Sequence, residues 1–305
     1  MTQEQILNSN LSKAAKARQL YNLGYTRHQV ADMICGGNYG WAHNIYKKHF
    51  NLETITRSLG SVFNHKFGIE LEAYGVDRLT LATALRSAGI YAEAEGYNHT
   101  TRRHWKVVTD GSLSGTQTFE LVSPVLKGEA GIAEVKKVCN VLQCCGAKIN
   151  RSCGFHVHFD ARQLSMGDWK NLYKNYITLE SEIDSMMPVT RRNNNNHYCR
   201  SLTAKNYTME RTFIAIDRAS TVSELSNLVA GTRYVKVNAE SFLRHGTVEF
   251  RQHSGSVEFE KISNWIKICG HLIDKSKAAL VNSLQEVLPE TLLNYVNIRK
   301  LKFAA

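Results

Sequence analysis

Charged and titratable residues recur at alternate positions in three short, otherwise apolar segments of the sequence. These pairs are Glu70-x-Glu72 in FGIELE, His156-x-His158 in CGFHVHFD and Glu249-x-Arg251 in TVEFRQ, and a further acid, Glu120, occurs in TFELVSP. Residues two apart in a β-strand point to the same face of the sheet. Each pair is therefore predicted to place both of its side chains on one face of a strand.

The residues that alternate with these polar groups are apolar, as the core-facing side of a sheet requires. They are Ile69, Leu71, Phe155, Val157, Phe159, Val248 and Phe250. If the strands are neighbours, four glutamates converge on the other face, where like charges a few Å apart cost roughly 1 to 4 kcal/mol each. A bound cation would remove that cost. Carboxylates with one or two imidazoles suit Mg²⁺ or Mn²⁺ better than a thiolate-bound zinc, so the segments predict a magnesium or manganese site.

Each segment also has an ordinary structural explanation when it is taken alone. A Glu-x-Glu pair is common on the solvent-facing side of an antiparallel strand, and Glu249 and Arg251 can form a same-face ion pair. Two histidines can form a hydrogen-bonded pair without a metal, and Asp110, in the turn before Glu120, can serve only to close a hairpin. Four separate strands with charged groups on one face have no single structural cause, which favours a shared site.

The composition is that of an ordinary globular protein with a basic bias. The 305 residues are 43% apolar and carry a formal net charge of +11, which favours polyanionic partners such as nucleic acid, nucleotide phosphates or acidic membrane surfaces. The seven cysteines show no CxxC spacing, which predicts reduced thiols in the cytoplasm. No apolar run reaches the roughly 18 to 20 residues of a membrane span, and the polar N-terminus does not resemble a signal peptide. A membrane partner is therefore not expected.

Three motifs of common enzyme classes are absent from the sequence. They are G-x-x-x-x-G-K-[ST], G-x-G-x-x-G and G-x-S-x-G. Their absence argues against a P-loop, a Rossmann dinucleotide site and a nucleophile elbow. The clustered acids therefore have no competing motif.

Residues 11–50 have the pattern of a compact helical unit. The segment LSKAAKARQLYNLGY is followed by Thr26, a predicted N-cap for the helix TRHQVADMI, and then by a glycine-containing break before NYGWAHNIYKKHF. Two helices around a short glycine turn predict a helix-turn-helix-like unit over residues 1–50. The polar segment 51–65 is predicted to be a linker, and residues 66–305 to form a second domain.

This N-terminal part of the chain carries an excess of positive charge. Up to residue 65 there are seven basic residues, Lys13, Lys16, Arg18, Arg27, Lys47, Lys48 and Arg57, against the three acids Glu4, Asp32 and Glu53. Such an excess suits contacts with phosphates, which predicts DNA binding through residues 11–50. A helical packing module without DNA binding is the alternative.

Beyond residue 66 the periodicity predicts an α+β mixture. Strands are expected at 90–95, 104–109, 117–123, 154–160, 233–239 and 246–252, and helices at 78–88, 129–145, 258–281 and 284–300. Capping boxes at Ser165 with Asp168 and at Thr221 with Glu224 predict two further helices, of which the first ends before Pro188. Arg191, Arg192 and the four asparagines after them predict a mobile loop near bound anions.

Taken in order, the motifs resemble those of the glutamine synthetase-like superfamily of carboxylate-amine ligases, and within it the amidoligase family, which is found often in phages and bacteria. The landmarks span about residues 66–270: FGIELE, W-x-V-x-x-DGSL from Trp105, FELVSPVL, CGFHVHFD, RYVKVN from Arg233, and GTVEFRQHSG. The resemblance implies a twisted antiparallel sheet, flanked by helices, whose concave face binds ATP and Mg²⁺ or Mn²⁺. A phage-encoded member would work in the cytoplasm of the host.

The resemblance also implies a reaction and a division of roles. The γ-phosphoryl group of ATP passes to a substrate carboxylate, and an amine attacks the resulting acyl phosphate to give an amide. By matching motif, the metal ligands are Glu70, Glu72, Glu120, His156 and Glu249; the catalytic residues are Arg251, Glu249 and Asp110; and the residues that contact the nucleotide are Arg251, His158, Arg233 and Lys236. The acid and amine substrates stay unidentified, and residues 1–50 lie outside the ligase core.

Two other functions also fit the residues. A basic helical module together with clustered acids describes metal-dependent nucleases and transposase-like enzymes that process DNA. A catalytically inactive protein that still binds a nucleotide is the second alternative.

Overall fold

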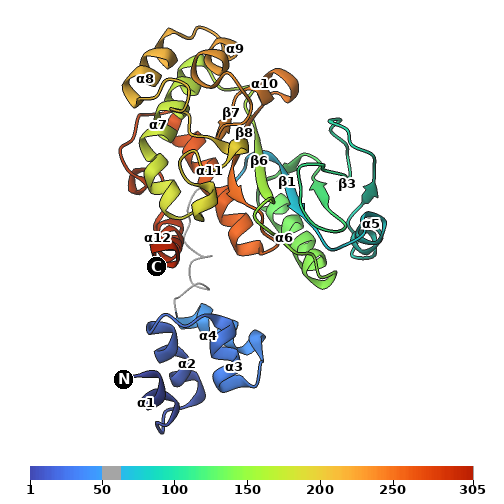
Figure 1. The fold of residues 1–305 in the computed structure, drawn as a ribbon, viewed down its shortest axis with the longest axis vertical. Helices are drawn as coiled ribbons and strands as arrows, with labels where there is room; N and C mark the ends of the chain where they lie inside the picture. Colours follow the sequence, from blue (N-terminus) through green and yellow to red (C-terminus); the bar gives the residue numbers. More distant parts are fainter. Residues whose placement is uncertain (50–62, 305) are drawn as a thin grey trace. The chain divides into compact units, whose positions relative to one another are not determined.

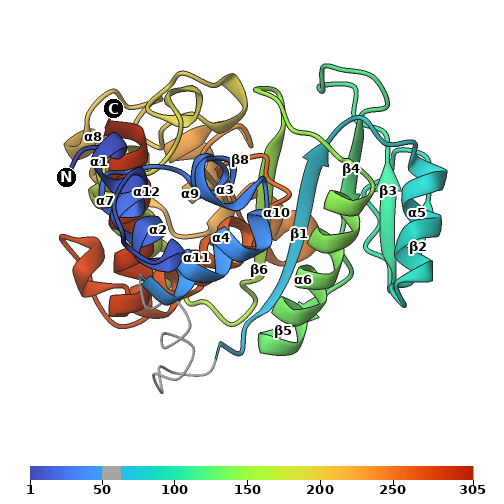
Figure 2. The same ribbon diagram turned by 90° about the horizontal axis from the view of Figure 1, so that it is seen from below.

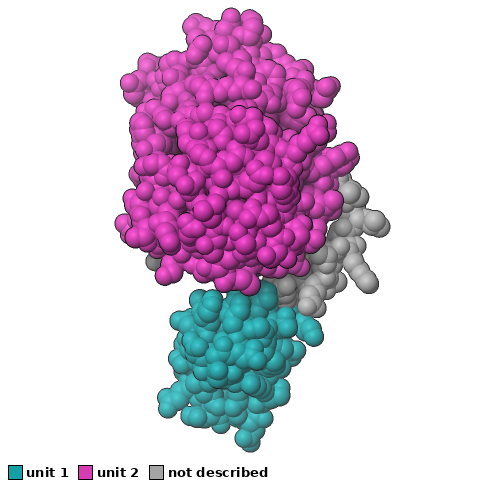
Figure 3. Space-filling model, turned by 90° about the vertical axis from the view of Figure 1, so that its right-hand side faces the viewer, with its two compact units in different colours: residues 1–61 teal, residues 62–305 magenta. Residues whose placement is uncertain are grey.

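The computed structural model describes residues 1–49 and 63–304 (Figure 1). The chain divides into two compact units, residues 1–61 and 62–305, which Figure 3 colours separately. Residues 51–62 of the predicted linker, 51–65, lie outside the described residues. Phe63, which the prediction placed in the linker, packs in the core of the larger unit. Within the described residues, no helix combines the length and apolar character needed to cross a membrane.

Within residues 1–49, the described part of the smaller unit, there are four helices. They are α1 (Gln3–Leu7), α2 (Lys13–Asn22), α3 (Arg27–Cys35) and α4 (Tyr39–His49). The predicted N-cap is confirmed, because the Thr26 hydroxyl accepts a hydrogen bond from the backbone N–H of Gln29. The predicted break is confirmed too: α3 ends at Gly36, whose φ of 56° lies in the left-handed region that favours glycine. Helix α1 was not predicted.

The larger unit is built on one mixed sheet. Its strands are β1 (Lys66–Ala73), β2 (Ala92–Ala94), β3 (Trp105–Val108), β4 (Phe119–Val122), β5 (Leu126–Lys127), β6 (Gly154–Asp160), β7 (Val237–Asn238) and β8 (Thr247–Ser254). The order across the sheet is β2-β3-β4-β1-β6-β8-β7, with β5 paired to β1. The prediction of an α+β fold is confirmed, but that of a purely antiparallel sheet is wrong at one edge. There, segment 95–104 crosses back so that β3 pairs in parallel with β2.

Helices flank this sheet (Figures 1 and 2). They are α5 (Arg78–Ser87), α6 (Gly128–Cys144), α7 (Met166–Ser185), α8 (Met209–Arg218), α9 (Val222–Leu225), α10 (Glu240–His245), α11 (Phe259–Ser276) and α12 (Glu290–Ala304). Short turns of other helix types lie at Val189–Arg191, His197–Cys199, Ser226–Ala230 and Leu284–Glu286. The predicted capping box holds at the start of α7, where Ser165 and Asp168 bond to each other's backbone N–H.

Two predicted elements begin several residues later than expected. The strand expected at 233–239 is reduced to β7. Before β7, the Tyr234 carbonyl and the Lys236 N–H hydrogen-bond to the backbone of Arg200, which forms an isolated bridge between Arg200 and Val235. The helix expected at 284–300 begins only at Glu290, directly after Pro289, which has no N–H and is favoured at a helix start.

The apolar face of the sheet packs as the alternation predicts. All seven apolar residues that alternate with the polar pairs are 0 to 1% exposed. Helices α6, α7 and α11 contribute side chains to the same core cluster, including Val135, Trp169 and Ile266. With one face covered, the charged residues of the same strands are left on the opposite face.

Candidate active site

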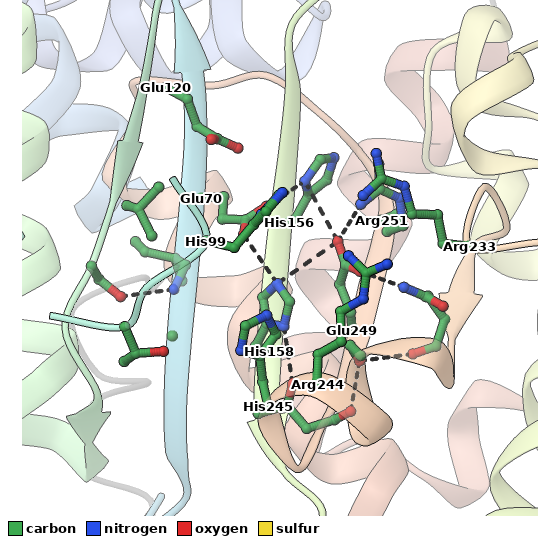
Figure 4. A pocket seen from close by; sticks show the side chains of 18 of the residues that line it. Glu70, His99, Glu120, His156, His158, Arg233, Arg244, His245, Glu249 and Arg251 are labelled. Carbon is green, nitrogen blue, oxygen red and sulfur yellow. Dashed lines mark hydrogen bonds and ion pairs between the residues drawn. The ribbon is translucent and has the colours of Figure 1, made fainter. Parts of the chain in front are cut away.

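Four adjacent strands bring the predicted polar residues together on that opposite face. Glu70 on β1 lies opposite His156 on β6, and Glu72 lies opposite Glu120 on β4. His158 lies opposite Glu249 on β8. Figure 4 shows the side chains of Glu70, Glu120, His156, His158 and Glu249 directed into one space. The convergence inferred from residue spacing is therefore present.

One group of possible ligands consists of Glu70, His156 and Glu249. The Nδ1 atom of His156 lies 3.0 Å from a carboxylate oxygen of Glu70 and 3.7 Å from one of Glu249. All three ligand atoms lie within 4.8 Å of one another. An oxygen-rich set with one imidazole is the chemistry predicted for Mg²⁺ or Mn²⁺.

A second group consists of Glu72, Glu120 and the same histidine. The Nε2 atom of His156 faces this group and lies 3.8 Å from a carboxylate oxygen of Glu72. A neutral imidazole has one lone-pair nitrogen, so His156 can ligate at only one of the two positions at a time. The other position would then be held by carboxylates together with water or substrate.

The electrostatics of the cluster show that its residues fit a cation. Burial and the nearby charges of Glu70, Glu72 and Asp110 raise the pKa of Glu120 well above its usual value. Burial also acts to raise the pKa of Glu70, but His158 and His156 more than offset it, so this pKa lies well below its usual value. The crowded carboxylates thus favour the protonated form of Glu120, and a divalent cation bound there would compete with that proton.

Metal binding should therefore release a proton from Glu120, and the apparent affinity should rise with pH. Because the raised pKa keeps the carboxyl protonated to higher pH, affinity should increase up to about tenfold per pH unit until that pKa is passed. Mn²⁺ titration calorimetry in two buffers of different ionisation enthalpy measures the proton count. Glu120→Gln should bind more weakly and lose this proton release; equal release by both proteins would contradict the assignment.

Backbone and side-chain hydrogen bonds hold the ligands in place. The Gly154 N–H donates to Glu72, and a Cβ at Gly154 would lie 3.0 Å from His156 Nε2 and 3.2 Å from Glu72 Oε2, so this position favours glycine. The Asn238 amide donates to the second oxygen of Glu249 at 2.7 Å. Such contacts orient ligating carboxylates. Asn238 was not among the predicted site residues.

Guanidinium groups form a cationic wall beside the ligands. Arg251 donates to Glu249, and its Nε lies 3.3 Å from the backbone carbonyl oxygen of Tyr198. Arg233 stacks over the ring of Tyr234, with its central carbon 5.1 Å from the ring centroid. In Figure 4 both arginines lie on the same side of the ligand cluster. This arrangement suits an anionic ligand bound next to the metal positions.

The ligands and the arginines line a cavity of about 590 Å³. Its size lies within the range of roughly 300 to 1,000 Å³ that is common for small-molecule sites. His158 lies in this cavity with its Nε2 3.3 Å from Glu70, and Asp110 lines it while accepting hydrogen bonds from the Ser112 N–H and hydroxyl at 2.7 Å. Asp110 therefore both closes its turn and faces the site.

Comparison with known proteins shows the family to which the chain belongs. The family described as "Putative amidoligase enzyme" matches residues 64–273. The chain belongs to this amidoligase family. A solved structure titled "Crystal structure of novel glutamine synthase homolog" is 12% identical, with 84% of this chain and 70% of that chain covered and a TM-score of 0.42. No curated protein matches the chain.

One residue predicted to contact the nucleotide does not reach the amidoligase cavity. Lys236 is 0% exposed, and its ammonium lies 2.6 Å from both Glu180 and Asp184 of α7. It lies only two residues from Asn238, which lines the cavity, but the backbone bends at Lys236. The alternation of β7 therefore does not extend to Lys236, and its side chain lies in the core. The prediction for Lys236 is therefore wrong: its role is in the core.

The predicted mobile loop is held in place by hydrogen bonds. The backbone N–H of Asn193 donates to Asp184 at 2.7 Å, and the Arg192 Nε donates to the Met187 carbonyl at 2.8 Å. Arg191 is 3% exposed, lines the cavity and donates to the Cys153 carbonyl at 2.6 Å. The loop does present an arginine to the amidoligase site, but as part of a fixed wall.

Several cavity residues were not predicted. They include Lys106, Tyr97, His99, Arg244 and His245. Arg244 and His245 belong to the short helix α10, directly before β8. Their closeness in sequence to the predicted strand at 246–252 is the only sequence feature that could have indicated them. Tyr97 and His99 come from segment 95–104, which joins the parallel strands β2 and β3 and contributes residues to the cavity lining.

Lys106 fixes this segment. It is 4% exposed, and its ammonium donates to the carbonyl and side-chain oxygens of Asn98 at 2.8 and 3.1 Å and to the Thr100 carbonyl at 3.0 Å. Lys106→Met should release the segment. Loss of one hydrogen bond to a charged group costs about 1.5 to 3 kcal/mol, so tryptic cleavage after the exposed Arg103 should accelerate on the order of tenfold or more. Lys106→Arg keeps the charge and is the control; unchanged cleavage of Lys106→Met would contradict this role.

Proposed function

We propose that this amidoligase-family protein is an ATP- and Mg²⁺-dependent carboxylate-amine ligase that forms an amide through an acyl phosphate. The observation that carries the proposal is the pair of carboxylate groups that share His156 inside a cavity faced by Arg251 and Arg233. Phosphoryl transfer requires mainly positioning and charge neutralisation, and it needs no protein nucleophile. The cavity offers both.

The metal positions follow from the two ligand groups. Glu70, His156 and Glu249 would hold one ion, and Glu72 with Glu120 the other. Bound Mg²⁺ supplies charge neutralisation and orientation of the triphosphate. Mn²⁺ suits the same ligands.

The proposed reaction has two steps. An oxygen of the substrate carboxylate attacks the γ-phosphorus of ATP, the bond to the β–γ bridging oxygen breaks, and ADP leaves. The amine nitrogen then attacks the acyl carbon, phosphate leaves, and the nitrogen loses a proton to form the amide. Arg251 neutralises charge on the transferring phosphoryl group, while Arg233 and His158 contact the nucleotide. Asp110, on the Glu120 side of the cavity, is the remaining predicted catalytic residue.

The charge of the cavity suits the binding of two divalent cations together with ATP. Its lining contains equal numbers of acids and of lysines or arginines, seven of each. Two divalent cations and a fully ionised nucleoside triphosphate also cancel each other's charge. The complete complex would therefore bind without a large charge imbalance, which buried sites disfavour.

We also propose a second role for the helical unit of residues 1–49, namely binding to DNA. This role is supported by the short glycine turn that joins α3 and α4 and by the six lysines and arginines against two acids. All seven cysteines are free thiols, which agrees with the cytoplasmic location that both roles imply.

Hydroxylamine trapping tests the ligase proposal without knowledge of the amine. Hydroxylamine attacks acyl phosphates to give hydroxamates, so wild-type protein with ATP, Mg²⁺ and a pool of carboxylic acids should release ADP and form hydroxamate in equal amounts. Glu70→Ala should do neither. The proposal would be refuted if wild-type protein formed no ADP with any acid pool, or if Glu70→Ala turned over at the wild-type rate. Cleavage of DNA that depends on a divalent metal would favour the nuclease alternative. Binding of ATP without turnover would favour the catalytically inactive alternative.

A further inference from the structure

The last two helices of the smaller unit are joined by a short glycine-containing turn, the connection that is typical of a helix-turn-helix. Helix α3 is followed by the turn Gly36-Gly37-Asn38 and then by α4. Both glycines have positive φ, 56° and 81°, which permits the tight turn, and the Asn38 side chain accepts from the Trp41 N–H at 3.0 Å to cap α4. In a helix-turn-helix the second helix lies in the major groove, and its N-terminal residues contact the bases.

One face of α4 is exposed and polar. Gly40, Asn44 and Lys48 follow each other at intervals of four residues and are all exposed. On the opposite side Ala42 is fully buried, and Ile45 packs against the same cluster. Since Gly40 has no Cβ, a DNA strand can approach the start of the helix closely. Asn44 carries the amide that pairs with adenine in the major groove, and Lys48 suits a phosphate.

Positive charge from the other helices surrounds the start of α4. The Lys13 ammonium of α2 lies 5.1 Å from the centroid of the Trp41 ring. The Arg27 guanidinium, at the start of α3, lies 2.9 Å from His43 and 5.9 Å from the ring centroid of Tyr39. Charges placed on both sides of an exposed helix match the two phosphate backbones that border a groove.

We infer that α4 enters the major groove of duplex DNA, with Asn44 at a base edge, Lys48 on a phosphate, and Lys13 and Arg27 on the flanking backbone. This docking rests on the proposed DNA-binding role of the unit. The helix has 11 residues and is therefore about 16 Å long, enough to cross a groove about 12 Å wide. The deep, narrow major groove of duplex RNA does not admit side chains in this way, and a flat membrane surface would not need an amide at the centre of the face.

The test uses the full chain and fluorescence anisotropy. A 20-base-pair duplex selected from a random pool with wild-type protein is compared with a scrambled duplex, over a range of salt concentrations. Lys48→Ala should weaken binding to both duplexes and lower the slope of log affinity against log salt by about one. Asn44→Ala should reduce the preference for the selected duplex roughly 5- to 150-fold. Lys137→Ala, which removes the same charge from the exposed surface of α6, should change neither.

The outcomes distinguish failure of this docking from failure of the proposed DNA-binding role. If the protein binds duplex DNA but Asn44→Ala and Lys48→Ala behave as wild type, the docking is overturned while DNA binding stands. Absence of duplex binding at 50 mM salt, or tighter binding to duplex RNA or to phosphatidylserine vesicles, overturns both. Circular dichroism confirms that each variant is folded, and ADP release, which depends on the other unit, should stay at the wild-type rate.

Discussion

Replacing Arg251 with alanine is expected to lower kcat for ADP release by about 10³- to 10⁵-fold, the range found for arginines that stabilise a transferring phosphoryl group. The Arg251 side chain is 13% exposed and reaches the cavity between Glu249 and the Tyr198 carbonyl. Its charge acts mainly when negative charge develops during transfer, so KM for ATP should change much less than kcat. Initial rates over a range of ATP concentrations separate the two constants.

Arg251→Lys is the matched control for this prediction. Lysine keeps the positive charge but lacks the planar fork that contacts two oxygens, so an intermediate rate is expected. Thermal unfolding of both variants checks that Glu249, which loses its partner, has not disturbed the sheet. A folded Arg251→Ala protein whose kcat stays within tenfold of wild type would show that Arg251 has no role in phosphoryl transfer.

Replacing Lys236 with methionine is expected to destabilise the larger unit by about 3 to 5 kcal/mol, because Glu180 and Asp184 would remain buried without their cation. For a unit of this size that corresponds to a fall in Tm of roughly 6 to 20 °C. Gln252 and the Asn193 N–H still donate to Asp184 in the variant, but neither carries a charge. Differential scanning calorimetry measures the transition of the larger unit.

The double variant Lys236→Met with Glu180→Gln tests the cause of this loss. Removing one of the two acids leaves a single buried charge that keeps its hydrogen bonds, so part of the lost stability should return. If Lys236→Met melts within 2 °C of wild type, the buried pair does not stabilise the fold as described, and a nucleotide-binding role for Lys236 would need to be reconsidered.

The site was predictable where side-chain periodicity carried the information. A period of two fixes which residues share a face, so the pairs on β1, β6 and β8 follow from the spacing, and the buried Ile69, Val157 and Phe250 confirm the face. The helix boundaries at Thr26 and Ser165 follow from capping, which is local chemistry. These features depend only on residues that are close together in the sequence, so the sequence is sufficient to predict them.

Features that depend on pairing between distant segments were not predictable. His156 lies between two carboxylate groups only because β1 pairs with both β4 and β6, and a register shift between β6 and β8 sets its distance to Glu249. No local pattern encodes that shift. Lys106 lies on β3, and it contacts Asn98 and Thr100 only because the parallel pairing of β2 and β3 makes the loop between them cross back over the sheet. Arg244 lines the cavity because α10 lies beside it in space, which no local pattern indicates. The orientation of Lys236 was not predictable either, because the backbone bends at this residue and interrupts the alternation of β7.

The most direct test of the central claim is a crystal structure with Mn²⁺ and a non-hydrolysable ATP analogue, with manganese located by anomalous scattering. The account predicts two manganese ions, one bound by Glu70 and Glu249 and one by Glu72 and Glu120, with His156 ligating one of them. The γ-phosphate of the analogue should lie against both ions and within hydrogen-bond distance of Arg251. Manganese or triphosphate bound elsewhere, with these carboxylates free of metal, would contradict the account.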